Sequence, residues 1–276
     1  MSDRTPLVSV LMPAYNAARF LRPAVESILN QTFDDFEFVI VDDGSTDDTG
    51  EILAECAARD PRIRVLTNER NLRIVASLNR GLDACRGTYV ARMDADDVAL
   101  PDRLAKQVAA LARQPDLAVL GGALTYIDAD GKKLNVTRHC TVGDSLLRKC
   151  PLLHPTVVLR RAVFARHGLR YRTEFREAED YYLWLETSRH GRLGAIDDVV
   201  LQYRVSGSAA RMTRVKRILW HTLRAKVRGA FGLGIRPTAR DVLRFAAECA
   251  LLAVPTALLR WIYLRRMFGK NADIAM

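Results

Sequence analysis

Three acidic segments stand out because each lies beside an apolar run of the chain. They read VIVDDGSTDD at residues 39–48, ARMDADD at residues 91–97 and REAEDYYLW at residues 176–184. Carboxylates can bind a hard divalent cation, accept hydrogen bonds from hydroxyl and N–H groups, or take up a proton during a reaction. Their separation along the chain predicts that the three segments perform different tasks.

The middle segment has the spacing of a metal site. Asp94 and Asp96 are one residue apart and follow residues 88–93, which we expect to form a buried strand. Two aspartates so placed at a strand end, together with a diphosphate, can hold a divalent cation such as Mg²⁺ or Mn²⁺. Acidic loops are also common as simple solvated surface, so this spacing indicates a metal only in combination with its surroundings.

The same letters fit a second chemistry. Asp94-Ala-Asp96-Asp97-Val98 matches the nucleophile motif of haloacid-dehalogenase-like phosphatases, in which Asp94 would be phosphorylated and Asp96 would act as acid and base. That motif belongs on the first strand of its domain. Here a full series of alternating strands and helices is predicted before it, which disfavours the phosphatase alternative.

The first segment ends the second predicted strand with Asp42 and Asp43, and Gly44-Ser45 turns the chain. A carboxylate at this place can accept a hydrogen bond from a base N–H or a ribose hydroxyl. It can equally cap its own loop, because Asp and Ser side chains commonly bond nearby backbone N–H groups. Both interpretations stay open at the level of the sequence.

The elements around these segments predict an α/β fold. Asn16 is expected to cap the first helix and Pro13 to end the first strand. Alternating strands and helices favour a mostly parallel sheet with helices on both faces, in which ligands bind at the carboxyl ends of the strands. The first two acidic segments lie at such ends. We expect strands at 7–12, 36–41, 63–66 and 88–93, with helices at 49–59, 74–85 and from Pro101; weaker patterns predict strands at 117–128, 155–159 and 199–205 and a helix at 181–188.

The net charge of +10 resides in the C-terminal quarter, because residues 204–276 hold 15 basic and 3 acidic side chains. Residues 207–276 are predicted to form a basic amphipathic helical tail with arginines beside Trp and Tyr. Such a composition suits the anionic surface of a membrane. A pair of helices packed on the domain or on a second subunit is the alternative. We expect no nucleic-acid partner, because the chain lacks aromatic stacking blocks and a recognisable reader fold.

The cysteines, the N-terminal residues and the apolar runs favour a cytoplasmic protein at the inner surface of the membrane. Five cysteines are scattered without a CxxC pair, which favours reduced thiols. The first ten residues lack the basic and apolar parts of a signal peptide. The best apolar run, residues 249–259, is far below the roughly 20 residues of a spanning helix, so we expect peripheral attachment on the cytoplasmic side.

Five blocks resemble, in order and spacing, the family-2 inverting glycosyltransferases with a GT-A fold, of the type that builds bacterial cell-surface polysaccharides. The resemblance covers residues 7–206, which gives a predicted domain at 1–206 and a tail at 207–276. The blocks are LVSVLMPAYN (7–16), VIVDDGSTDD (39–48), GTYVARMDADDVALPDR (87–103), LHPTVVLRR (153–161) and AEDYYLWLE (178–186).

The resemblance implies metal-dependent transfer of a sugar from a nucleoside-diphosphate sugar, with UDP favoured, to a hydroxyl of a glycan or lipid-linked acceptor. It also implies a divalent metal cofactor, Mn²⁺ or Mg²⁺, and a role for each matching residue. Those roles are nucleotide binding by Pro13, Ala14, Tyr15, Asp42, Asp43, Arg73 and Asp94, metal binding by Asp94 and Asp96, general base catalysis by Asp180, and acceptor or diphosphate contacts by His154 and Glu179.

The chain departs from the family at Asn71-Leu72-Arg73, where the pattern is often Asn-x-Gly. Arg73 therefore either touches the base or a phosphate, or only covers the edge of the pocket. His154 has the alternative of a buried structural histidine. Arg204 is a further candidate for a phosphate contact.

Overall fold

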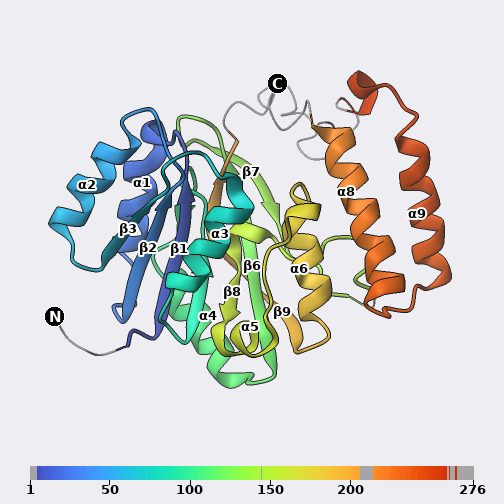
Figure 1. Cartoon of the computed structure of the whole chain (residues 1–276), viewed down its shortest axis with the longest axis horizontal. Helices are drawn as coiled ribbons and strands as arrows, with labels where there is room; N and C mark the ends of the chain where they lie inside the picture. Colours follow the sequence, from blue (N-terminus) through green and yellow to red (C-terminus); the bar gives the residue numbers. More distant parts are fainter. Residues whose placement is uncertain (1–4, 144, 206–213, 260, 262–264, 266–276) are drawn as a thin grey trace.

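The computed structural model of the chain describes residues 5–143, 145–205, 214–259, 261 and 265. A single curved sheet occupies the centre, and helices α8 and α9 stand together at one side of the molecule (Figure 1). The sheet has nine strands in the order β3-β2-β1-β4-β8-β6-β9-β5, and β7 pairs with β6 outside that path. The predicted α/β class is confirmed.

The N-terminal half of the sheet is parallel, as the sequence predicts. β1, β2 and β4 are buried along their whole length because apolar residues face helices on both sides, whereas the edge strand β3 is buried only at Ile63. Val10 and Met12 pack with α1 and α2, whereas Leu11 packs with α3. The elements are β1 (Val8–Ala14), α1 (Ala18–Leu29), β2 (Phe36–Asp42), α2 (Thr49–Arg59), β3 (Ile63–Thr67), α3 (Arg73–Ala84) and β4 (Tyr89–Arg92).

The other half of the sheet is mixed, so the parallel character predicted for the whole sheet holds only as far as β4. The short strand β8 enters after a 3₁₀ turn and runs antiparallel to both β4 and β6, while β6 and β9 are parallel. These pairings join segments far apart in sequence, which local patterns do not specify. The elements are β5 (Val98–Ala99), α4 (Arg103–Arg113), β6 (Leu117–Ile127), β7 (Lys133–Arg138), η1 (His154–Thr156), β8 (Val158–Arg160), α5 (Arg161–His167), η2 (Thr173–Phe175), α6 (Glu179–Thr187) and β9 (Arg192–Arg204).

Two local predictions about the first loop are wrong. Pro13 lies inside β1, where its missing N–H costs nothing, because β4 pairs with β1 only as far as Leu11. Asn16 does not cap α1. Its side chain instead accepts a hydrogen bond from the Thr46 backbone N–H at 2.8 Å, with a left-handed backbone φ of 48°. Asn16 thus ties the loop after β1 to the loop after β2.

The two C-terminal helices pack on the rest of the chain. α8 (Val215–Val227) lies against α6, and a π-helical turn (Arg228–Gly232) leads to α9 (Ala239–Leu251). Leu147, Tyr181 and Ala225 meet in one buried apolar cluster between these elements. The predicted domain boundary after residue 206 falls outside the described residues. Within the described part of the chain, no helix has the length and apolar content to cross a bilayer.

Candidate active site

The first two acidic segments lie at the same edge of the sheet, as their sequence positions predict. Asp42 ends β2, and the segment 94–97 follows β4, with β1 between these strands. Tyr15 leaves the end of β1 at this edge and is 46% exposed, whereas Pro13 and Ala14 behind it are buried. An exposed aromatic ring beside two carboxylate-bearing loops suits the binding of a flat base.

Asp42 caps its own loop. Its Oδ1 accepts hydrogen bonds from Ser45 N at 3.1 Å and from Ser45 Oγ at 2.6 Å, and the side chain is buried. The loop-capping interpretation of the sequence therefore describes what Asp42 does in the structure. Any nucleotide contact by Asp42 would come in addition to that role.

Asp43 joins the loop after β2 to the loop after β3. Its Oδ1 accepts from Asn68 Nδ2 at 2.6 Å and from Leu72 N at 2.9 Å, and its Oδ2 accepts from Arg73 N at 2.8 Å. Gly44 lets the two loops touch, since a Cβ at that residue would lie 2.6 Å from the carbonyl carbon of Arg70. Asp43 is thus a buried organiser of the predicted nucleotide pocket.

The backbone conformation at Arg73 is one that suits the glycine of the family's pattern. Its backbone is left-handed, with a φ of 72°, a conformation that glycine adopts without cost and other residues disfavour. The hydrogen bonds from Arg73 N to Asp43 and to Asn71 Oδ1 hold it there. Its side chain is exposed, so it lies at the edge of the pocket.

The middle segment brings three carboxylates together. Ligand atoms of Asp94, Asp96 and Asp97 all lie within 4.8 Å of one another. Asp97 is fully buried; its Oδ1 accepts from Arg204 N at 2.9 Å, while its Oδ2 has no hydrogen-bond partner among the described residues. Burial, followed by the charges of Asp94 and Asp96, raises the pKa of Asp97 well above its usual range. An orphaned buried oxygen beside two acids fits a divalent cation, whose charge would offset this repulsion.

Arg204 braces this segment from the end of β9. Its Nε donates to Asp96 O at 2.8 Å, and its Nη1 donates to the carbonyl oxygens of Asp128 and Ala129. The guanidinium also stacks over Phe20, with its carbon 4.8 Å from the ring centre. These contacts with backbone carbonyls fix the position of the acidic loop, and the phosphate contact of Arg204 stays a prediction.

Arg92 is the functional residue that sequence reasoning missed. Buried at the end of β4, its guanidinium binds both oxygens of Asp94, at 2.7 and 2.5 Å. Burial opposes its charge, but Asp94, Tyr171 and Asp97 together raise the pKa of Arg92 above its ordinary value. A charged residue inside the otherwise apolar run TYVARM was the available signal, since buried arginines are rarely left unpaired.

Tyr171 and His154 contact each other near the middle and third acidic segments. His154 Nε2 lies 2.8 Å from Tyr171 Oη, and its ring meets the edge of Trp184. Burial raises the pKa of Tyr171; the charge of Arg92 opposes this rise, while Asp180, Glu179 and Asp94 reinforce it. The charges of both acidic segments therefore act on the pKa of Tyr171. His154 is half-buried and holds its place through its contacts with Tyr171 and Trp184.

The third segment begins α6. Asp180 Oδ1 accepts from Tyr181 N at 2.7 Å, and Cys150 Sγ lies 3.9 Å from Asp180 Oδ2. Burial, and then the charge of Asp180, raises the pKa of Glu179 well above its usual range, while Arg92 opposes this shift. Glu179 therefore takes up a proton more readily than an ordinary glutamate.

The aromatic residues of α6 anchor the helix. Trp184 and Leu185 are completely buried, and Tyr181 and Tyr182 are nearly so. Tyr182 also lines a surface pocket together with Phe175 and Arg224. The charges of Arg92, Asp94, Glu179 and Asp180 all act on the pKa of Tyr171, which is consistent with the middle and third segments lying near each other.

Comparisons with known proteins agree with this geometry. Residues 9–177 match the model of the family described as "Glycosyl transferase family 2". A Haemophilus influenzae protein described as an uncharacterized glycosyltransferase is 34% identical over 219 residues, covering 75% of this chain and 68% of that protein.

Two solved structures share the fold. S. aureus TarS 1–349 in complex with UDP aligns with a TM-score of 0.61 at 18% identity, covering 97% of this chain and 88% of that 1–349 chain. The mannosyltransferase PcManGT from Pyrobaculum calidifontis, in complex with GDP-Man and Mn²⁺, aligns with a TM-score of 0.62 at 20% identity, covering 98% and 83%.

The left-handed residue gives a stability prediction. Because a left-handed backbone costs a non-glycine residue about 1 kcal/mol, Arg73→Gly should raise Tm by about 2 °C. Asp43→Asn should lower Tm, because its amide nitrogen replaces an oxygen that accepts hydrogen bonds from the segment after β3. Thermal denaturation followed by circular dichroism measures both changes. A lower Tm for Arg73→Gly would show that the arginine side chain stabilises the loop.

Proposed function

Since the chain belongs to glycosyl transferase family 2 and is a glycosyltransferase with a GT-A fold, we propose that it transfers a sugar with inversion from a nucleoside-diphosphate sugar to a hydroxyl of a glycan or lipid-linked acceptor. A UDP-sugar is the favoured donor. The observation that carries the proposal is the grouping of three carboxylates after β4, which lies near the Glu179–Asp180 pair with Tyr171 between the two segments.

Donor binding is assigned to the loops after β1 and β2. Tyr15 offers an exposed ring for the base, with Pro13 and Ala14 behind it. Asp43 Oδ2 accepts one hydrogen bond among the described residues, from Arg73 N, and a carboxylate oxygen can accept two. Asp43 can thus take a base N–H while it holds the loops. The S. aureus structure with UDP supports the placement of a nucleotide in this fold.

The diphosphate is assigned to the middle segment. A divalent cation held by Asp94 and Asp96 would stabilise the negative charge that develops on the leaving nucleoside diphosphate. Arg92 binds both oxygens of Asp94 and so fixes the direction of that carboxylate. Asp94 can then also approach the ribose. Mn²⁺ in the archaeal mannosyltransferase structure supports this assignment.

Asp180 is assigned the proton transfer. As general base it would take the proton of the acceptor hydroxyl while that oxygen attacks the sugar from the face opposite the leaving group, which inverts the configuration. Burial and the charge of Asp180 raise the pKa of Glu179, so we assign Glu179 as the member of the pair that takes up a proton more readily and Asp180 as the base. The N-terminus of α6 also favours a carboxylate there. His154 lies on the acceptor or diphosphate side of this pair.

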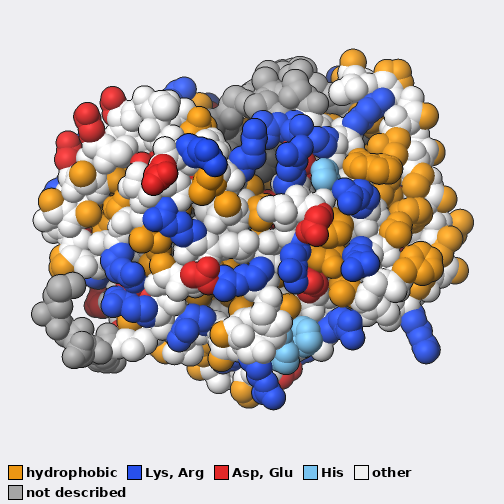
Figure 2. Space-filling view, in the orientation of Figure 1, with side chains coloured by type: hydrophobic (Ala, Val, Ile, Leu, Met, Phe, Trp, Pro, Cys, Tyr) orange, Lys and Arg blue, Asp and Glu red, His pale blue; other side chains and the backbone are white. Residues whose placement is uncertain are grey.

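The C-terminal helices are assigned a peripheral contact with the cytoplasmic leaflet, where a lipid-linked acceptor would be presented. Figure 2 shows hydrophobic side chains gathered over α9 with Lys and Arg beside them. Leu243 and Phe231 are 71% and 87% exposed, and the acids of α9, Asp241 and Glu248, are buried. An apolar face rimmed by cations matches anionic lipid headgroups.

Two substitutions separate the assigned roles. Asp180→Asn should lower the transfer rate by at least about 100-fold, because general base catalysis contributes that much, yet leave donor affinity unchanged. Asp96→Asn should instead weaken Mn²⁺-dependent donor binding, since it removes a metal ligand. Donor binding is measured by calorimetry with and without Mn²⁺, and transfer by release of the nucleoside diphosphate.

Glu179→Gln is the matched control for Asp180→Asn. Its amide imitates the protonated carboxyl group of Glu179, so it should keep transfer within about threefold of the wild-type rate at pH 7. Full turnover by the Asp180→Asn protein would remove Asp180 from the role of base. An aspartyl phosphate on Asp94 would favour the phosphatase chemistry that the sequence also allows.

The membrane contact has its own test. The protein should sediment with vesicles containing phosphatidylglycerol more than with neutral vesicles, and less as salt rises. Leu243→Asp should weaken binding by about tenfold or more, because it replaces an exposed leucine of the face assigned to lipid by a negative charge. Val142→Asp changes an exposed valine outside the tail and should have no effect. Wild-type protein that stays in the supernatant with anionic vesicles would contradict the assignment.

A further inference from the structure

A turn at residues 145–150 lies between the C-terminal helices and the N-terminus of α6. We propose that Asp241 of α9 and Lys226 of α8 are positioning residues for Asp180, acting through this turn. The proposal rests on the proposed function of Asp180 as the base. It makes the C-terminal helices part of the catalytic apparatus.

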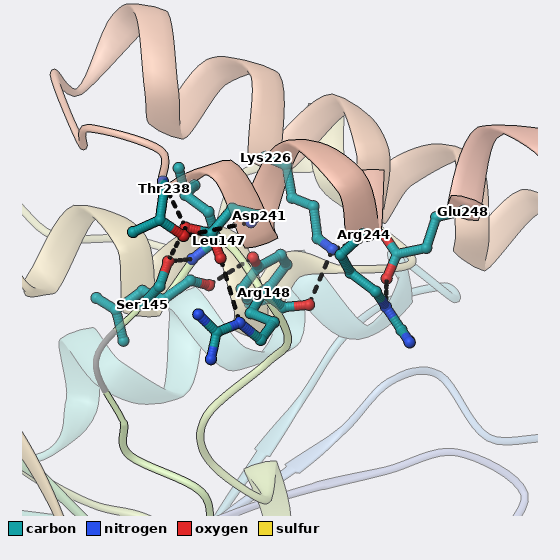
Figure 3. Close-up of polar contacts among 10 residues, drawn as sticks. Ser145, Leu147, Arg148, Lys226, Thr238, Asp241, Arg244 and Glu248 are labelled. Atoms are coloured by element: carbon teal, nitrogen blue, oxygen red, sulfur yellow. Dashed lines mark hydrogen bonds and ion pairs between the residues drawn. The ribbon is translucent and has the colours of Figure 1, made fainter. Parts of the chain in front are cut away.

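Asp241 holds the first end of the turn. It is 3% exposed, and its Oδ2 accepts from Ser145 Oγ at 2.7 Å, as Figure 3 shows. The same oxygen accepts from Thr238 N at 2.8 Å and from Thr238 Oγ1 at 2.7 Å, which completes a capping box at the start of α9. Arg148 Nε lies 3.4 Å from Asp241 Oδ1. One buried carboxylate thus begins the helix and binds the turn.

Lys226 holds the middle of the turn. Its ammonium group donates to Arg148 O at 3.1 Å and to Glu248 Oε2 at 2.5 Å (Figure 3). Lys226 and Glu248 are both buried, with 3% and 7% of their surface exposed. The carboxylate of Glu248 thus neutralises the ammonium group of Lys226, which would otherwise be costly to bury. Arg244 Nε donates to the other oxygen of Glu248 at 2.7 Å. α8 and α9 are therefore locked to each other and to the turn's backbone.

The opposite side of the turn contacts α6 at the proposed base. Leu146 O accepts from Tyr181 Oη at 2.6 Å, and Leu147 is buried in the apolar cluster with Tyr181 and Leu185. Cys150 Sγ lies 3.9 Å from Asp180 Oδ2. The turn thus touches two consecutive residues of α6, one of which is Asp180.

Both flanks of Asp180 are consequently set by packing. Leu183 and Trp184 fix α6 from the sheet side, and the turn fixes it from the side of the C-terminal helices. A base must lie within hydrogen-bond reach of the hydroxyl it deprotonates, and a displacement of about 1 Å can cost 100-fold in rate. Breaking the contacts from α9 should therefore reduce turnover without touching the donor site.

Ser145→Ala and Asp241→Ala test this proposal in the full-length protein. Ser145→Ala removes the hydroxyl that bonds Asp241 and leaves the Thr238 cap in place, so it keeps the test valid if Asp241→Ala fails to fold. Both should lower kcat about tenfold or more with donor affinity unchanged, and both should shift the pH profile of kcat, because the surroundings of Asp180 change. Arg244→Ala breaks a contact within α9 alone and should stay within about twofold of wild type.

The outcomes distinguish this proposal from the proposed function. If Asp180→Asn is inactive while folded Ser145→Ala and Asp241→Ala turn over at the wild-type rate and pH profile, positioning by α9 is wrong and the base stands. If kcat and donor affinity fall together in both variants and in Arg244→Ala, the contacts only stabilise the fold, and the proposal is again wrong. If Asp180→Asn is fully active, the proposed base itself fails.

Discussion

The ion pair between Arg92 and Asp94 is the interaction on which the site depends. A guanidinium buried at the end of a central strand is costly unless nearby acids bind it. Here Asp94 binds it directly, and Asp97, Tyr171 and Glu179 lie within its electrostatic reach. A second buried guanidinium, that of Arg103, also lies near Asp97 and Asp94, so two buried cations offset the charge of the middle segment.

Many of the polar side chains around the site hold its loops in place through hydrogen bonds. Asp43 fixes two loops through three hydrogen bonds, and Arg204 holds the acidic loop through backbone carbonyls. The turn at 145–150 does the same for the start of α6 with help from α8 and α9. A site whose supports are buried and bonded can present charge to a ligand without rearranging, which is the condition for electrostatic catalysis.

Local patterns were sufficient for the parallel half of the sheet and for the placement of its acidic loops. Strand ends of β2 and β4 follow from apolar runs, and neighbouring parallel strands share an edge. The partners of Arg92 could not be predicted, because Tyr171 and Glu179 lie roughly 80 residues away along the chain and reach it through the antiparallel strands. The left-handed backbone at Arg73 could not be predicted either, because an arginine disfavours this conformation and the hydrogen bond to Asp43 that holds it is not visible in the sequence.

The most direct measurement replaces Arg92 by methionine, which keeps the bulk of the side chain and removes its charge. Mn²⁺-dependent binding of the nucleotide sugar and the rate of transfer are then determined on protein shown by circular dichroism to be folded. Both should fall by about tenfold or more, because Asp94 loses its partner and the acids around it repel one another. A folded Arg92→Met protein that binds donor and transfers sugar like the wild type would contradict the central place of this ion pair.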